Sequence, residues 1–196
     1  MKLFHMPGTC SQAIYITLTE LGIPCEISIV TKTNRDELLK YNPRGQVPTL
    51  VLDNGQVLTE GAVIQSYLCD LKAEMNLMPK AGTWERYKTQ EALNYVATEL
   101  HKGIGALFSS DMPEAGKAVN KANAIKKLEL LNAFFGKNQF LYGSTYTPAD
   151  AYCFVVVNWT KWLGIDMTPF KNILGFNERI AKRPAVQKVL QADTPK

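Results

Sequence analysis

Residues 2–12 read KLFHMPGTCSQ, and this stretch predicts a strand, a tight turn and the start of a helix. Residues 2–6 are expected to form the strand and Pro7-Gly8 the turn. Thr9 and Gln12 have the spacing of a capping box, in which each side chain bonds a free backbone N–H group at the start of a helix. Apolar residues then repeat at helical spacing, so the first strand leads directly into a helix.

Cys10 is expected at the first position of that helix, which makes it a candidate reactive thiol. The free N–H groups and the positive end of the helix dipole favour an anion there, and this predicts a lowered pKa for the thiol. A small, buried, unreactive cysteine is the alternative role. Position alone does not decide between the two.

Composition and charge narrow the class of protein. The chain has 196 residues, of which 46% are hydrophobic and 20% are charged, as in a globular protein with one large domain or two small ones. The net charge of +4 favours small anionic ligands, but no basic stretch is interleaved with aromatic residues, so no nucleic-acid partner is expected. We find no secretory signal and no apolar run of membrane-spanning length, which predicts a cytoplasmic protein without a membrane partner.

The cysteines indicate a reducing environment. They are Cys10, Cys25, Cys69 and Cys153. They are widely spaced, and no Cys-x-x-Cys pair suggests zinc or a dithiol redox motif. We therefore expect four reduced thiols and no metal site.

Short strands alternate with helices in the first part of the chain. A strand is predicted over residues 25–30, parallel to the first strand, and a short helix over residues 36–41. A hairpin and a further helix follow. The predicted order is strand, helix, strand, helix, strand, strand, helix, which is the order of a thioredoxin-like domain.

The hairpin has the strongest local signal in this part. Residues 49–53 and 56–58 flank Asn54-Gly55, which predicts a type I′ turn because both of its central residues need a positive φ. Thr59 is expected to cap the helix that follows, through about residue 70.

Helical patterns dominate after a linker marked by Pro79 and Gly82. The predicted helices are a long one from residue 83, a second over residues 114–135, a third opened by the capping box Thr147-Pro148-Ala149-Asp150, and a last amphipathic helix that continues past Arg183-Pro184. The third carries the apolar run 152–157 and is expected to be buried on all sides. The predicted domains are residues 1–78 and 84–196.

Six short motifs occur along the chain in order. They are Pro7-Gly8-x-Cys10-Ser11, Asn42-Pro43-Arg44-Gly45-Gln46-Val47-Pro48, Thr59-Glu60-Gly61-Ala62-Val63-Ile64, Glu99-Leu100-His101-Lys102, Tyr146-Thr147-Pro148-Ala149-Asp150-Ala151-Tyr152 and Arg183-Pro184-x-Val186. With these motifs the chain resembles the cytosolic glutathione transferases, most closely the bacterial beta class, over residues 1 to about 192. The resemblance implies a fold that is α/β plus all-α, with a thioredoxin-like N-terminal domain followed by an all-helical C-terminal domain.

The resemblance also implies glutathione as a co-substrate and no tightly bound cofactor. The residues expected to bind glutathione are Cys10, Val47, Pro48, Glu60, Gly61, Asn94, Glu99, His101 and Lys102, and Cys10 and His101 are the expected catalytic residues. The resemblance implies that the Val47-Pro48 bond is cis and that the Val47 backbone pairs with the cysteinyl unit of glutathione. Glu60 then accepts the γ-glutamyl ammonium, and free N–H groups of Gly61 and Ala62 bind the carboxylate.

Several of these residues have plainer alternative roles. Glu60 is suited simply to complement a helix dipole, and a lone histidine such as His101 is often a structural residue. Many relatives have a serine in place of Gly61, so in this chain the γ-glutamyl carboxylate depends on backbone N–H groups alone. A tyrosine is frequent in the class in place of His5, so the first strand lacks that hydroxyl here. Lys32 or Arg35 is expected to meet the glycyl carboxylate.

The electrophile pocket is expected between the two domains, lined by His5, Phe108, Trp159 and Trp162. Plain core packing is the alternative for the tryptophans.

Asn94 and Glu99 resemble residues that reach the glutathione of a neighbouring subunit, which implies a homodimer. The implied function is conjugation of glutathione to small hydrophobic electrophiles in detoxification. Two alternatives stay open: thiol-disulfide or peroxide reduction through Cys10, and non-catalytic binding of hydrophobic compounds.

Overall fold

A four-stranded sheet forms the first half of the molecule in a computed structural model that describes residues 1–31 and 33–194. Its strands are β1 (Lys2–His5), β2 (Glu26–Ile29), β3 (Thr49–Val51) and β4 (Val57–Thr59), in the spatial order β2-β1-β3-β4. β1 is parallel to β2, and β3 is antiparallel to both β1 and β4. The predicted order of strands and helices along the chain and the parallel first pair are confirmed.

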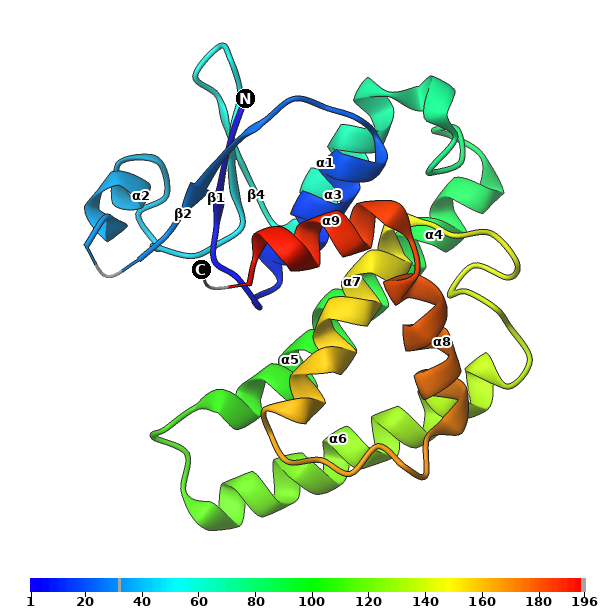
Figure 1. The fold of residues 1–196 in the computed structure, drawn as a ribbon. Coiled ribbons are helices and arrows are strands. Elements are labelled where there is room, and N and C mark those ends of the chain that lie inside the picture. The colour runs from blue at the N-terminus through cyan, green and yellow to red at the C-terminus, as the bar shows by residue number, and fades with distance from the viewer. Residues whose placement is uncertain (32, 195–196) are drawn as a thin grey trace.

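Helices cover both faces of this sheet (Figure 1). They are α1 (Ser11–Glu20), α2 (Arg35–Tyr41) and α3 (Gly61–Leu71), followed by a 3₁₀ turn, η1 (Ala73–Met75). Successive strand residues point to opposite faces, so Leu3 joins the large core with α1 and α3, whereas Phe4 packs with Leu38 of α2. The first half therefore has the thioredoxin-like arrangement that the sequence predicts.

The second half is entirely helical in the described part of the chain. Its elements are α4 (Trp84–Tyr95), the π-helical segment η2 (Val96–His101), α5 (Lys102–Gly105), the 3₁₀ turn η3 (Ala106–Phe108), α6 (Glu114–Phe135), α7 (Pro148–Asn158), the 3₁₀ turn η4 (Trp159–Lys161), α8 (Lys171–Ala181) and α9 (Pro184–Ala192). Figure 1 shows α7 at the centre, α6 along one side and α9 lying between the two halves. Within residues 1–31 and 33–194 no helix combines the length and the apolar composition that crossing a membrane requires.

α7 is buried along nearly its whole length, as predicted. Its predicted capping box forms: the Asp150 carboxylate accepts from the Thr147 N–H at 2.8 Å and from the Leu141 N–H at 2.7 Å. The Asp150 side chain is fully buried, and these bonds supply the partners that a buried carboxylate needs. The cap fixes where this central helix begins.

Two predicted caps do not form. Gln12 donates to Asp193 instead of returning to Thr9, and α1 begins at Ser11 with Cys10 as its N-cap. Thr59 ends β4, and Glu60 is the N-cap of α3 with φ +69°. A long-range hydrogen bond to Asp193 thus replaces the first cap, and a strained Glu60 backbone replaces the second.

The hairpin turn also differs from the prediction. Gly55 has φ +81°, but Asn54 does not have a positive φ. The Gly55 N–H donates to the Leu52 carbonyl and the Leu52 N–H to the Gln56 carbonyl, which closes a three-residue loop. One left-handed glycine is sufficient for this loop, so the type I′ assignment was wrong.

The last predicted helix is two helices. α8 ends at Ala181, and α9 starts at Pro184 after the N-cap Arg183. Proline lacks an N–H group and fits the first turn of a helix, so the chain starts a new helix there.

Candidate functional site

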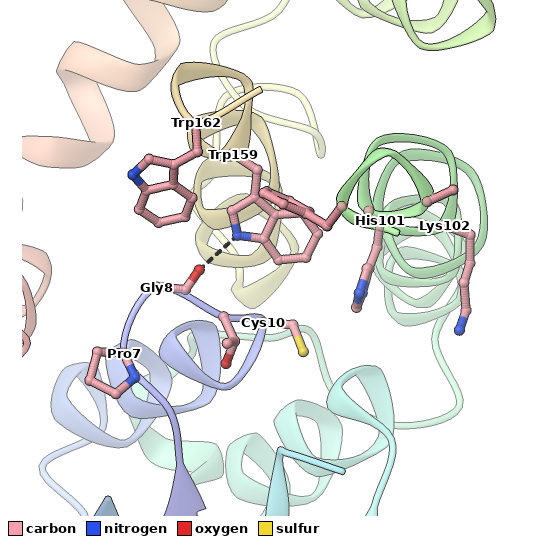
Figure 2. Close-up of a pocket in the computed structure, with 11 residues that line it drawn as sticks. Pro7, Gly8, Cys10, His101, Lys102, Trp159 and Trp162 are labelled. Carbon is pink, nitrogen blue, oxygen red and sulfur yellow. Dashed lines mark hydrogen bonds between the residues drawn. The ribbon is translucent and has the colours of Figure 1, made fainter. Parts of the chain in front are cut away.

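A pocket of about 600 Å³ lies between the β1–α1 turn and the helical half (Figure 2). The turn contributes residues 7–10, and the helical half contributes His101, Lys102 and three aromatic side chains. The aromatic residues are Phe108, Trp159 and Trp162. Six of the predicted site residues, from segments far apart in the sequence, thus line one cavity.

Two tryptophans join the turn to the helical half. Trp159 Nε1 donates to the Gly8 carbonyl at 2.8 Å, and only 5% of this side chain is exposed. Trp162 is 64% exposed and lies against Gly8, where a Cβ atom would come within 2.7 Å of its ring. Because Gly8 also has φ +75°, no other residue fits the turn without strain.

Cys10 points into the pocket from the N-terminal end of α1 (Figure 2). Its thiol donates to the Val47 carbonyl at 3.5 Å. Burial raises the pKa of Cys10 to about 11, against the smaller lowering effects of the backbone N–H groups at the helix start and of Lys102. The expected lowering of the pKa is therefore wrong for the unliganded protein, because desolvation outweighs the helix terminus.

His101 ends the π-helical segment and faces the same space as Cys10 (Figure 2). Its Nδ1 lies 2.6 Å from the Tyr152 hydroxyl, and its ring packs edge-on against Trp159 with centroids 4.8 Å apart. Burial, aided by the charge of Lys102, lowers the pKa of His101 to about 4. The imidazole is thus neutral at physiological pH and is held by contacts from α7 and η4.

Val47 and Glu60 border the turn on its other side. The Val47-Pro48 peptide bond is cis, as the resemblance implied. Glu60 combines φ +69° with a carboxylate that is 69% exposed at the start of α3, and it pairs with Arg44 at 3.4 Å. Positive φ is uncommon outside glycine and is often found at functional sites. A backbone edge, an exposed carboxylate and a helix N-terminus therefore lie close to the cysteine.

The comparisons with known proteins agree with this geometry. Residues 8–71 match the N-terminal domain of glutathione S-transferases, and residues 98–193 match the C-terminal domain. The chain belongs to the glutathione S-transferase family.

Relatives of this transferase match it over almost the whole chain. It is 40% identical to the glutathione S-transferase GstA of Escherichia coli O157:H7, over 98% of each protein. A ternary complex of BphK, a bacterial transferase, superposes with a TM-score of 0.94 at 34% identity, covering 98% of this chain and 99% of that one. The bacterial beta class transferase of Sphingomonas chungbukensis has a TM-score of 0.94 at 35% identity over 98% of each chain. The resemblance to the beta class is confirmed.

Three predicted site residues of the transferase, His5, Asn94 and Glu99, belong neither to the pocket lining nor to the segments around Val47 and Glu60. His5 is fully buried and bonds Ser11 and Asp193, so its assignment to the electrophile pocket is corrected. Asn94 and Glu99 are exposed and do not line the pocket. Glu99 pairs there with Lys127 at 2.6 Å.

Lys32 and Arg35 are the two residues that the sequence offers to bind the glycyl carboxylate of glutathione. Lys32 lies outside the described residues. Arg35 begins α2, and its guanidinium lies against Gly45, 3.2 Å from where a Cβ would stand. Gly45 is two residues before Val47, so Arg35 borders the backbone edge of the transferase site.

Sequence reasoning missed two residues of the site. Tyr152 belongs to the fifth motif and to the apolar run of α7, but neither pattern predicts its contact with His101. Arg44 follows a helix-breaking proline and has no local pattern that points to Glu60. Both are long-range partners, which periodicity does not reveal.

The raised pKa of Cys10 predicts how its reactivity depends on pH. The thiolate fraction rises about tenfold per pH unit below the pKa, so alkylation of Cys10 by iodoacetamide should accelerate steadily from about pH 6 to about pH 9. Mass mapping of each cysteine measures the rate, with Cys10→Ser as the control. A plateau near about pH 6.5 would instead show an activated thiol.

Proposed function

We propose that this transferase conjugates the thiol of glutathione to small hydrophobic electrophiles, as an enzyme of detoxification. The observation that carries the proposal is the convergence of Cys10 and the aromatic wall on one pocket, with Val47 beside Cys10. A cysteine, a free backbone edge and an apolar cavity meet the needs of a peptide thiol and its electrophile. The aromatic side chains favour flat, apolar electrophiles.

Glutathione is anchored by main-chain and charged groups. The Val47 backbone pairs with the cysteinyl unit as a neighbouring strand does, and Pro48 shapes that edge. Glu60 accepts the γ-glutamyl ammonium, and the N–H groups at the start of α3, from Gly61 onward, bind the carboxylate. Arg35 meets the glycyl carboxylate. Arg44 neutralises Glu60 until the ammonium replaces it.

Cys10 acts as a neutral donor in this mechanism. Its S–H group turns from the Val47 carbonyl to the glutathione sulfur and stabilises that sulfur as a thiolate once its proton has left to solvent. The Lys102 charge favours the same anion, and neutral His101 orients the sulfur. The sulfur then forms a bond to the electrophilic carbon, whose leaving group departs with its electron pair. Holding both reactants in place supplies about 7–11 kcal/mol in favourable cases, more than thiol activation alone.

Activity with an aromatic halide tests the proposal directly. We expect glutathione-dependent loss of 1-chloro-2,4-dinitrobenzene, with most of the conjugation retained in Cys10→Ser because a hydroxyl also donates a hydrogen bond. Protein that binds glutathione but shows no turnover across a panel of electrophiles would contradict conjugation and leave non-catalytic binding. Intact mass after treatment with oxidised glutathione separates the other alternative. A mixed disulfide lost in Cys10→Ser, together with lost turnover, would indicate thiol-disulfide chemistry.

Gly61 offers a matched pair of substitutions. A Cβ at Gly61 would meet its nearest neighbours at 3.8–3.9 Å, which is ordinary contact, and the residue does not have a positive φ. In Gly61→Ser the added hydroxyl should bond the γ-glutamyl carboxylate and lower the glutathione Kd about tenfold, as expected for a hydrogen bond to a charged group. Gly61→Ala adds the same Cβ without the hydroxyl. Equal Kd values for the two variants in calorimetry would contradict the placement of the carboxylate.

We further propose that the transferase is a cytoplasmic homodimer whose sites are completed across the interface by Asn94 and Glu99. Support comes from large apolar side chains that are exposed along α3 and α4: Val63 is 50% exposed, Trp84 72% and Tyr87 57%. Several large apolar side chains exposed on neighbouring helices are typical of an interface. The four cysteines are unpaired in the structure, in keeping with a reducing compartment.

The dimer proposal predicts the mass in solution. Analytical ultracentrifugation should give about twice the chain mass of 21.9 kDa. In Tyr87→Asp a charge enters the apolar face, and the mass should fall toward that of one chain at micromolar concentration. A wild-type protein that sediments as a single chain, or glutathione binding that Asn94→Ala leaves unaffected, would contradict a shared site.

A further inference from the structure

Asp193 connects the C-terminal end of the chain to the start of the active-site turn. Its Oδ1 lies 2.9 Å from His5 Nε2, and its Oδ2 accepts from Gln12 Nε2 at 2.6 Å. On the other side of the ring, His5 Nδ1 lies 2.8 Å from the Ser11 hydroxyl, which also accepts from the Met6 N–H at 3.1 Å. The His5 side chain is fully buried and that of Asp193 is 6% exposed.

This network encloses the turn that carries Cys10. His5 is the last residue of β1 and Gln12 the second residue of α1, so one carboxylate fixes the distance between the two ends of the turn. Within the turn, Trp159 holds the Gly8 carbonyl. The turn is therefore held at two places, at Gly8 by Trp159 and at its two ends by Asp193.

α9 is itself attached to the first half at both ends. The Arg183 guanidinium at its start pairs with the Glu20 carboxylate at 2.6 Å, and Asp193 follows its last turn. Between these points the helix packs along α1 (Figure 1). Asp193 is therefore held in a fixed place on a rigid element, as a positioning group needs to be.

The order Ser11, His5, Asp193 resembles a hydrolytic triad, but the geometry excludes that role. The Ser11 side chain is fully buried and does not line the pocket, so it cannot reach a substrate. Its oxygen already lies within hydrogen-bond distance of the Thr9 hydroxyl, at 2.8 Å, and of the Met6 N–H group. The network therefore acts on the turn and not on a bound molecule.

We propose that Asp193 is a positioning residue for the reaction at Cys10, holding the β1–α1 turn through His5 and Gln12. The kinetic part of this inference rests on the proposed function, whereas the placement of the turn does not. Without the carboxylate, the buried His5 ring and the Gln12 amide lose their shared acceptor. The turn then moves, and the half-buried Cys10 thiol becomes more exposed to water.

Alkylation of individual cysteines tests the placement of the turn. In Asp193→Ala we expect the iodoacetamide rate at Cys10 to rise at least about fivefold, because the thiol loses the burial that suppresses its ionisation. Cys69 and Cys153 are buried in other elements, α3 and α7, and should stay unreacted. They serve as internal reporters of global unfolding. An unchanged rate at Cys10, or a parallel rise at all three cysteines, would overturn the proposal.

Two variants are matched controls. Asp193→Asn keeps the shape, and its amide satisfies both partners: the oxygen accepts from Gln12 and the NH₂ group donates to the other tautomer of His5. Its Cys10 rate should stay within about twofold of the wild type, since hydrogen bonds and not charge hold the turn. Thr194→Ala changes the next residue, whose hydroxyl bonds only the Leu190 carbonyl of its own helix, and should have no effect. A rise in the Cys10 alkylation rate as large in Asp193→Asn as in Asp193→Ala would contradict the mechanism.

Kinetics complete the test. In Asp193→Ala we expect kcat per glutathione-binding site to fall at least about tenfold, with the sites counted by calorimetry. The glutathione Kd should change less than about threefold, because Val47 and Glu60 lie on other elements. A fall in kcat only in proportion to the number of binding sites would show a merely structural role. If the wild type itself has no turnover, the proposed function fails while the alkylation result still decides the placement of the turn.

Discussion

Burial of α7 on all sides is the constraint on which the rest of the molecule depends. A helix with no wet face must be covered from every direction, and α7 is covered by α1 and α3 from the sheet half and by α4, the π-helical segment and α8 from the helical half. At the start of α7 the buried Gln65 amide joins the two halves. It donates to the Pro148 carbonyl and to the Thr17 hydroxyl, each at 3.0 Å. The two halves are thus one packed unit, and the groove between them has fixed walls.

The pocket beside Cys10 is a consequence of that packing. Tyr152 on α7 holds His101, and Trp159, directly after α7, holds the Gly8 carbonyl. α7 therefore fixes the positions of both sides of the pocket, although Cys10 and His101 are far apart in the sequence. The same burial sets the protonation states, since it raises the pKa of Cys10 and lowers that of His101. The neutral thiol and neutral imidazole provide hydrogen bonds and orientation in place of charge.

Local signals in the sequence predicted most of the fold. The alternating strands, the limits of α6 and the Thr147–Asp150 capping box need only near neighbours in the chain, and the structure has them. The failures involve competition from distant residues: Gln12 leaves its expected cap for Asp193, 181 positions away. The prediction of a lowered Cys10 pKa failed for a related reason. The position of Cys10 at the helix start is visible in the sequence, but the residues that bury it come from distant segments. The motifs named His101 as a site residue, but neither its partner Tyr152 nor the burial of His5 had a local pattern.

A crystal structure with bound glutathione measures the central claim most directly, namely that the glutathione sulfur lies against Cys10 at the start of α1. We predict a sulfur within about 4 Å of Cys10 Sγ, with no covalent bond between them, and cysteinyl main-chain hydrogen bonds to Val47. Glutathione bound away from the turn, or a sulfur separated from Cys10 by protein side chains, would contradict the account.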